Sequence, residues 1–261
     1  MRSKDYLYIL VLVIIAIFIP RIMLFYVVCG IIDFHRSKTF DITNWRRYFL
    51  GNGLLTWILS PFNLLMDLLC DKNPGVYTLE DLPYECQSEI KQLMVLADNK
   101  PEIITELGNM MEQKRRGMLF FKWYGKNIDT SLSIPEFHQE FKYINTIGVS
   151  VFNKQQETSI HYGPLRITIR VLYNLVPVRN DEIYIKAADK THLWHDNPLF
   201  IFDDTLVHQS VNRSDNLRYV MFVDILRPSN HLGLLKYLVN GVRFVMISYN
   251  RVFYKNWDML K

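Results

Sequence analysis

The stretch HYGPLRITIRVLYNL, residues 161–175, carries the pattern that decides the fold. From Arg166 to Leu172 polar and apolar side chains alternate, which is the period of a β-strand with two different faces. One face carries Arg166, Thr168, Arg170 and Leu172, and the other carries Ile167, Ile169 and Val171. We therefore expect one face of this strand to contact an apolar core and the other to present charge.

Further short runs rich in Ile, Val, Phe and Tyr surround this strand, separated by Asn, Asp, Gly or Pro. They are Met118–Tyr124, Ile147–Phe152, Glu182–Ala187, Leu199–Phe202 and Arg218–Leu226. Short strands at this spacing are typical of an antiparallel sandwich or barrel. The sequence predicts a mainly β domain over residues 118–230.

The N-terminal segment Leu7–Ile32 is apolar or aromatic except for Pro20, Arg21 and Gly30. A bilayer is spanned by about 20 apolar residues, so we expect a single-pass anchor within residues 1–34. The alternative is a shallow hairpin with its tip at Pro20-Arg21. Lys and Arg are in excess after the segment, which favours a cytoplasmic C-terminal domain.

Three further segments have helical patterns. Residues 35–74 include a broken apolar stretch, Leu54–Cys70, which predicts interfacial helices. Residues 75–117 show helical spacing of Leu, Ile and Met from Leu79, which predicts a helical segment packed on the β-domain. Residues 231–261 predict an amphipathic helix that either touches the membrane or packs on the β-domain. Both interpretations of this last helix remain open.

Charge and cysteine content exclude some classes of protein. The formal net charge of the 261 residues is only +4, and no basic stripe points to nucleic acid as a partner. The three cysteines are isolated from one another in the sequence, so a disulfide framework is not expected.

The polar residues that carry chemistry are His161, His208 and Arg218. His161 precedes one strand, His208 follows another, and Arg218 opens a third strand ten residues later. Two histidines with a carboxylate are the usual ligands of non-heme iron(II) oxygenases, and the arginine fork binds a carboxylate bidentately. A lone histidine is more often structural, so the joint spacing of the three residues carries the hypothesis.

Three motifs support it: HYGPLRITIR (161–170), IFDDTLVH (201–208) and LRYVMFVDILRP (217–228). Together they resemble the aspartyl/asparaginyl β-hydroxylase family over roughly residues 118–230. Upstream, FFKWYGKN (120–127), SPFNLLMDLL (60–69) and PGVYTLEDLP (74–83) are most similar to the membrane-bound lipid A hydroxylases of that family. With these motifs the resemblance extends over nearly the whole chain.

The resemblance implies a double-stranded β-helix of the jelly-roll, cupin-like kind. It further implies a dioxygenase that uses Fe(II), 2-oxoglutarate and dioxygen to hydroxylate an unactivated carbon. By the same resemblance His161 and His208 ligate the iron, while Arg218, Arg170 and Ser150 hold 2-oxoglutarate.

Two positions depart from the lipid A hydroxylase pattern. Gly163 stands where these enzymes have an aspartate ligand, and Leu172 stands where many members have a histidine. Similar animal enzymes also have glycine at the first position, with water completing the coordination of iron. A lipid acyl chain and a protein Asp or Asn side chain both remain candidate substrates, and a catalytically silent binding or scaffolding protein at a membrane is the alternative function.

Overall fold

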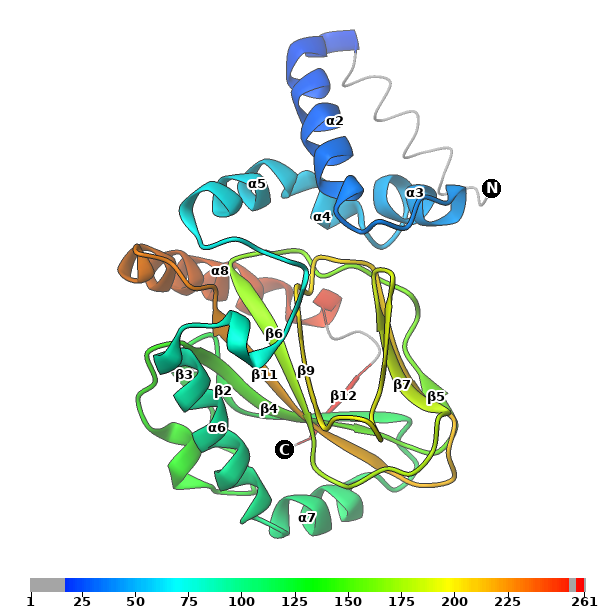
Figure 1. The fold of residues 1–261 in the computed structure, drawn as a ribbon, viewed down its shortest axis with the longest axis vertical. Coiled ribbons are helices and arrows are strands. Elements are labelled where there is room, and N and C mark those ends of the chain that lie inside the picture. Colours follow the sequence, from blue (N-terminus) through cyan, green and yellow to red (C-terminus); the bar gives the residue numbers. More distant parts are fainter. Residues whose placement is uncertain (1–16, 254–256, 261) are drawn as a thin grey trace.

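The computed structural model of the protein describes residues 17–253 and 257–260, and its strands form two sheets (Figure 1). The larger, eight-stranded sheet has the order β1-β9-β6-β11-β4-β2-β12, with β3 paired to β2. Its strands are β1 Val76–Tyr77, β2 Arg116–Trp123, β3 Lys126–Asn127, β4 Ile144–Phe152, β6 Thr168–Asn174, β9 Leu199–Phe202, β11 Arg218–Leu226 and β12 Asp258–Met259. The four-stranded sheet contains β5 Gln156–Glu157, β10 His208–Asn212, β7 Ile183–Ala187 and β8 Lys190–Leu193, in that order.

The two sheets face each other across an apolar cluster. Leu172 and Val220 of the larger sheet pack in one cluster with Ile185 of the smaller sheet. The predicted cupin-like β fold is therefore confirmed, and a strand forms at each of the six predicted runs. The sequence did not reveal β10, because HQSVN lacks the apolar alternation of a typical strand.

Two helices cover the outer face of the larger sheet. They are α6 Tyr84–Asp98 and α7 Glu102–Met110, preceded by the short 3-10 helix Leu79–Asp81. Ile90 of α6 and Leu107 of α7 belong to the same buried cluster as Val149 and Val171 of the sheet. This packing puts Val171 in the core, as the strand alternation predicted, and leaves the opposite face of β6 for the space between the sheets.

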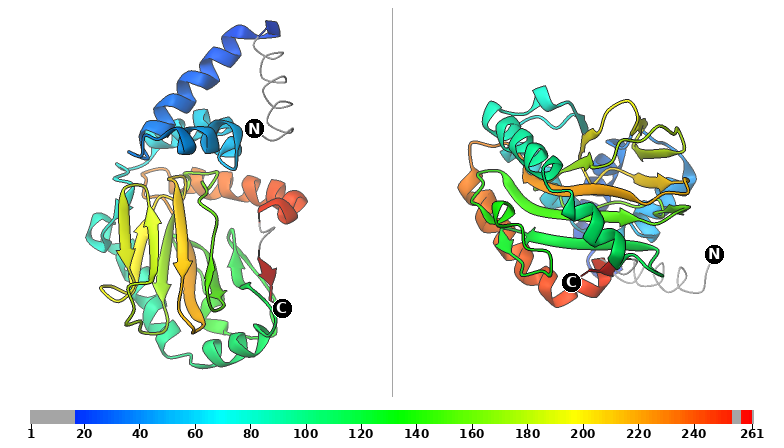
Figure 2. Two further views of the ribbon diagram at one scale, coloured as in Figure 1. Left: turned by 90° about the vertical axis from the view of Figure 1, so that its right-hand side faces the viewer. Right: turned by 90° about the horizontal axis from the view of Figure 1, so that it is seen from below.

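The remaining helices lie at one end of the two sheets (Figure 2). We call α2 Pro20–His35, α3 Ile42–Leu50, α4 Leu54–Ile58 and α5 Ser60–Leu69 the roof helices. Beneath them runs α8, Leu232–Phe253. Met66 of α5 packs in one cluster with Leu235 of α8 and Leu226 of β11, so α8 packs on the β-domain.

The predicted N-terminal anchor falls only in part on residues that the structure describes. Residues 1–16 lie outside the described residues, and within the described part Ile19 is not helical while α2 begins at Pro20. Proline restricts the residue before it and is favoured in the first turn of a helix, so helix α2 starts anew there. In residues 17–253 and 257–260 no helix is both long enough and apolar enough to cross a membrane.

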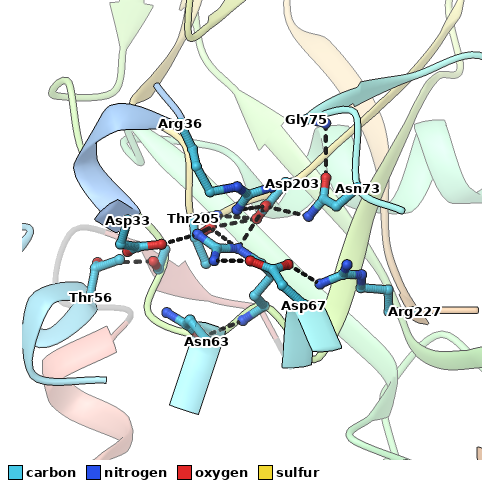
Figure 3. A network of polar contacts seen from close by, with 12 residues as sticks. Asp33, Arg36, Thr56, Asn63, Asp67, Asn73, Gly75, Asp203, Thr205 and Arg227 are labelled. Carbon is cyan, nitrogen blue, oxygen red and sulfur yellow. Dashed lines mark hydrogen bonds and ion pairs between the residues drawn. The ribbon is translucent and has the colours of Figure 1, made fainter. Parts of the chain in front are cut away.

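A buried ionic network joins the roof helices to the β-domain (Figure 3). Its centre is Arg166, which pairs with Asp33 of α2, with Asp67 of α5 at 2.9 Å and with Asp203 at 3.0 Å. Three arginines and three aspartates take part, so the charges balance: Arg36, Arg166, Arg227, Asp33, Asp67 and Asp203. The network joins the roof to the segments that precede β6 and β10, next to His161 and His208.

Candidate active site

A cavity of about 190 Å³ lies between the two sheets. Its lining includes all five residues that the sequence singled out: Ser150, His161, Arg170, His208 and Arg218. They come from β4, β6, β10, β11 and the loop before β6. The fold thus brings together side chains that are far apart in the sequence.

His161 and His208 lie side by side at this cavity. Their backbones form an isolated antiparallel bridge, with N–H to O distances of 3.0 and 2.9 Å, and their ring centroids are 4.1 Å apart. The Nδ1 atom of His161 lies 2.7 Å from the Ser159 carbonyl, and that of His208 lies 2.8 Å from the Leu206 carbonyl. Because a carbonyl only accepts, each Nδ1 carries the proton and each Nε2 keeps a free lone pair.

Both imidazoles are neutral at physiological pH. Burial lowers the pKa of His208 to about 4, and burial together with the neighbouring His208 lowers the pKa of His161. A neutral imidazole with a free Nε2 is the form that binds metal ions. In the described part of the chain no group of three or more His, Cys, Asp and Glu side chains is arranged as a metal site, so the candidate ligands are these two imidazoles.

Asp204 occupies the space that a side chain at position 163 would need. A Cβ atom added to Gly163 would lie 2.0 Å from Asp204 Oδ2 and 2.7 Å from the Asp204 carbonyl oxygen. The Asp204 carboxylate lies 3.4 Å from His208 Nε2 and 3.2 Å from Arg170 Nη1. The carboxylate beside the histidine pair therefore comes from position 204 rather than from position 163.

We predict that Gly163→Ala lowers the free energy of unfolding by about 1–3 kcal/mol, because backbone atoms of residue 204 must shift to admit the methyl group. The matched control is Gly233→Ala, since nothing lies within 4 Å of the added Cβ there and alanine is the better helix former. Denaturant unfolding of the full chain checks both. Equal midpoints for Gly163→Ala and wild type would contradict the close packing.

Arg218 is a buried guanidinium without an acidic partner among the described residues. It is 3% exposed, and burial lowers its pKa. Nη2 donates to Ser210 at 2.7 Å and Nη1 to the Val211 carbonyl at 3.1 Å, while Nε has no hydrogen-bond partner in the described structure. A buried charge without a counter-charge is strongly unfavourable, so this arrangement suits an anionic ligand.

Arg170 is placed differently from Arg218. Its Nε donates to Asp224 at 2.6 Å, and its Nη1 lies 3.2 Å from Asp204. Two carboxylates thus already balance its charge. Ser150 is buried and donates to the Val220 carbonyl at 3.3 Å, and Leu172 lines the same cavity.

Sequence reasoning missed Ser210, which lines the cavity and contacts Arg218. The sequence signal for Ser210 was its position two residues after His208, since this spacing puts both side chains on one face of a strand. It went unused because β10 itself was not recognised. Sequence reasoning also gave no role to the polar side chains of α4 and α5, which contact the His161 loop.

Known proteins resemble parts of this chain. It is 24% identical over 173 residues to the ornithine lipid ester-linked acyl 2-hydroxylase of Rhizobium tropici, covering 60% of this chain and 62% of that protein. The chain thus spans less than two thirds of the relative's length.

Among solved structures, a cupin domain from Bordetella pertussis gives a TM-score of 0.27 at 13% identity, covering 43% of this chain and 96% of that one. A member of the 2OG-Fe(II) oxygenase family from Burkholderia pseudomallei gives a TM-score of 0.27 at 12% identity, covering 33% of this chain and 44% of that one.

A family assignment comes from the sequence profile described as aspartyl/asparaginyl beta-hydroxylase, which matches residues 85–228. That range is more than half of the 261 residues. It contains both histidines, Asp204 and Arg218. The chain belongs to the aspartyl/asparaginyl β-hydroxylase family.

Proposed function

We propose that this protein is a hydroxylase that depends on iron(II) and 2-oxoglutarate. The observation that carries the proposal is Arg218, a buried guanidinium without a carboxylate partner among the described residues, in the same cavity as two neutral imidazoles. A dicarboxylate that binds a metal at one end and an arginine at the other satisfies both features. 2-Oxoglutarate is such a molecule.

The residues present fit a metal ion. His161 and His208 would hold iron through their free Nε2 atoms, with Asp204 as the nearby carboxylate. When bound, iron(II) supplies the activation of dioxygen that hydroxylates a carbon while 2-oxoglutarate becomes succinate and carbon dioxide. The protein's own part is to bind the far carboxylate at Arg218 and Ser150 and to keep water from the site between the sheets.

A lipid acyl chain is the substrate that we favour. The cavity lining combines polar side chains, among them Arg218 and Ser210, with many apolar ones. The apolar wall includes Met118, Leu172, Val220, Phe222 and Trp257. Such a wall suits a hydrocarbon chain, and the relative from Rhizobium tropici is named for a lipid acyl substrate. An Asp or Asn side chain, suggested by Gly163, is the competing substrate.

The roof helices offer a surface for contact with lipid. Their exposed apolar side chains include Ile22, Leu24, Phe25, Val28, Ile31 and Ile32 of α2, Trp45 of α3, Ile58 of α4, and Leu65 and Leu68 of α5. Exposed apolar areas of this kind mark membrane or protein contacts. We propose that this surface lies against the membrane; the cytoplasmic placement stays a prediction from the Lys and Arg count.

The test is release of succinate from 2-oxoglutarate by the purified full chain with iron(II) and ascorbate. Mass spectrometry of lipids and peptides from cells with and without the protein would then look for a gain of one oxygen, which separates the two substrate classes. A folded protein that binds no iron and releases no succinate would contradict the proposal and support a silent binding or scaffolding protein.

Arg218 gives the sharpest variant. Arg218→Met should weaken 2-oxoglutarate binding by about 10–100-fold, since a charged hydrogen-bonded contact contributes roughly 1.5–3 kcal/mol. The affinity of Arg218→Lys should fall between those of wild type and Arg218→Met. Because the arginine has no acidic partner among the described residues, Arg218→Met should keep or raise the unfolding midpoint without co-substrate. Isothermal titration and thermal unfolding measure both effects. Unchanged affinity for 2-oxoglutarate in Arg218→Met would remove this residue from the site.

A further inference from the structure

Side chains from the roof-helix segment form hydrogen bonds to the loop that carries His161. Three hydrogen bonds, one exposed and two buried or partly buried, join side chains near or within α4 and α5 to backbone carbonyls of this loop. They are Asn52 to Ile160 at 2.7 Å, Thr56 to Gly163 at 3.0 Å and Asn63 to Pro164 at 3.1 Å. Figure 3 shows Thr56 and Asn63 beside the ionic network that also joins these helices to the β-domain.

Asn63 makes the most specific of these contacts. Its side chain is fully buried, its Nδ2 donates to the Pro164 carbonyl, and its Oδ1 accepts from the Arg166 amide at 2.9 Å. One amide group thus satisfies a backbone acceptor and a backbone donor two residues apart. Buried backbone groups left without partners are destabilising, and only a side chain that both donates and accepts can serve both.

We propose that Asn63 is a positioning residue for the first metal ligand. Through the 164–166 backbone it fixes the loop in which His161 forms its bridge to His208. The helix that carries Asn63 exposes Leu65 and Leu68 on its outer side. The helix that contributes Leu65 and Leu68 to the proposed lipid surface thus also holds the loop of His161. The expected effect of Asn63 on metal binding rests on the proposed metal site. The expected effect of Asn63 on the loop backbone does not.

The test compares three variants of the full chain. Asn63→Leu removes both hydrogen bonds, and Asn63→Asp keeps an acceptor for Arg166 while losing the donor to Pro164. Met66→Ala is the matched control, because Met66 is fully buried on the same helix and packs with Leu165 and Ile167. Its truncation destabilises by leaving a cavity but removes no hydrogen bond to the loop backbone. The readouts are affinity for Mn²⁺ and hydrogen exchange of the backbone amides of residues 161–163.

Asn63→Leu should weaken Mn²⁺ binding by about 10–100-fold, as loss of a residue that orients a ligand does, and should speed exchange at residues 161–163. Both readouts for Asn63→Asp should lie between those of wild type and Asn63→Leu. If Asn63→Leu does not fold, Asn63→Asp provides the test. Met66→Ala should lower the unfolding midpoint and leave both readouts near wild type.

Unchanged exchange in Asn63→Leu, or equal changes in Met66→Ala, would overturn the positioning role. If wild type bound no Mn²⁺ while Asn63→Leu still sped local exchange, the metal site would fail and the positioning role would stand.

Discussion

The His208→Ala variant is expected to lose both metal binding and succinate release, and His161→Ala should behave in the same way. The reason is the small number of ligands. In the described structure no group of three or more His, Cys, Asp and Glu side chains is arranged as a metal site, so removing one imidazole removes one of only two candidate nitrogen ligands. We expect Mn²⁺ affinity to fall by more than about 100-fold, beyond the 10–100-fold effect of residues that only orient ligands.

His192→Ala is the matched control for this experiment. His192 lies on β8, stacks on Phe200 with ring centroids 4.6 Å apart and contacts the Asn197 carbonyl, and it is not part of the cavity lining. The Mn²⁺ affinity of the His192→Ala variant should equal that of wild type. Titration with Mn²⁺ and measurement of succinate check all three variants, and normal metal binding by His208→Ala would contradict the two-histidine site.

The Arg166→Met variant should lower the free energy of unfolding by about 3–5 kcal/mol, because removing one partner of a buried ion pair leaves charge uncompensated. Arg166 is 1% exposed and Asp203 is fully buried. Without the guanidinium, Asp33 and Asp203 would remain buried with fewer positive partners. Burial raises the pKa of Asp203, but Arg166, Arg36 and the hydrogen bonds from Thr205 hold it below its usual range.

Arg213→Met is the control for charge loss alone. Arg213 pairs with Glu157 at 3.0 Å, but both side chains are about half exposed, and exposed pairs contribute at most about 1 kcal/mol. Denaturant unfolding of the full chain gives both values. A loss for Arg166→Met no larger than that for Arg213→Met would show that the network does not stabilise the junction of roof and β-domain.

Much of the β-domain could be predicted from local sequence. Alternation on one strand placed Ile169 and Val171 in the core and Arg170 at the cavity, as found. Helical spacing likewise indicated α6 and α7. These elements follow from side-chain period alone, because a strand or helix with one apolar face has one way to bury it. Pro20, the tip of the alternative shallow hairpin, is where helix α2 begins.

The order and spacing of His161, His208 and Arg218 in the sequence also pointed to three side chains that line the cavity, although not to Ser210. What only the tertiary structure decided are their surroundings: the free Nε2 atoms, the absence of an acid beside Arg218 in the described residues, and Asp204 in the space beside Gly163. The pairing of Asp33 with Arg166 spans 133 residues. Such contacts depend on how finished elements pack against one another, and no local pattern of residues records that packing.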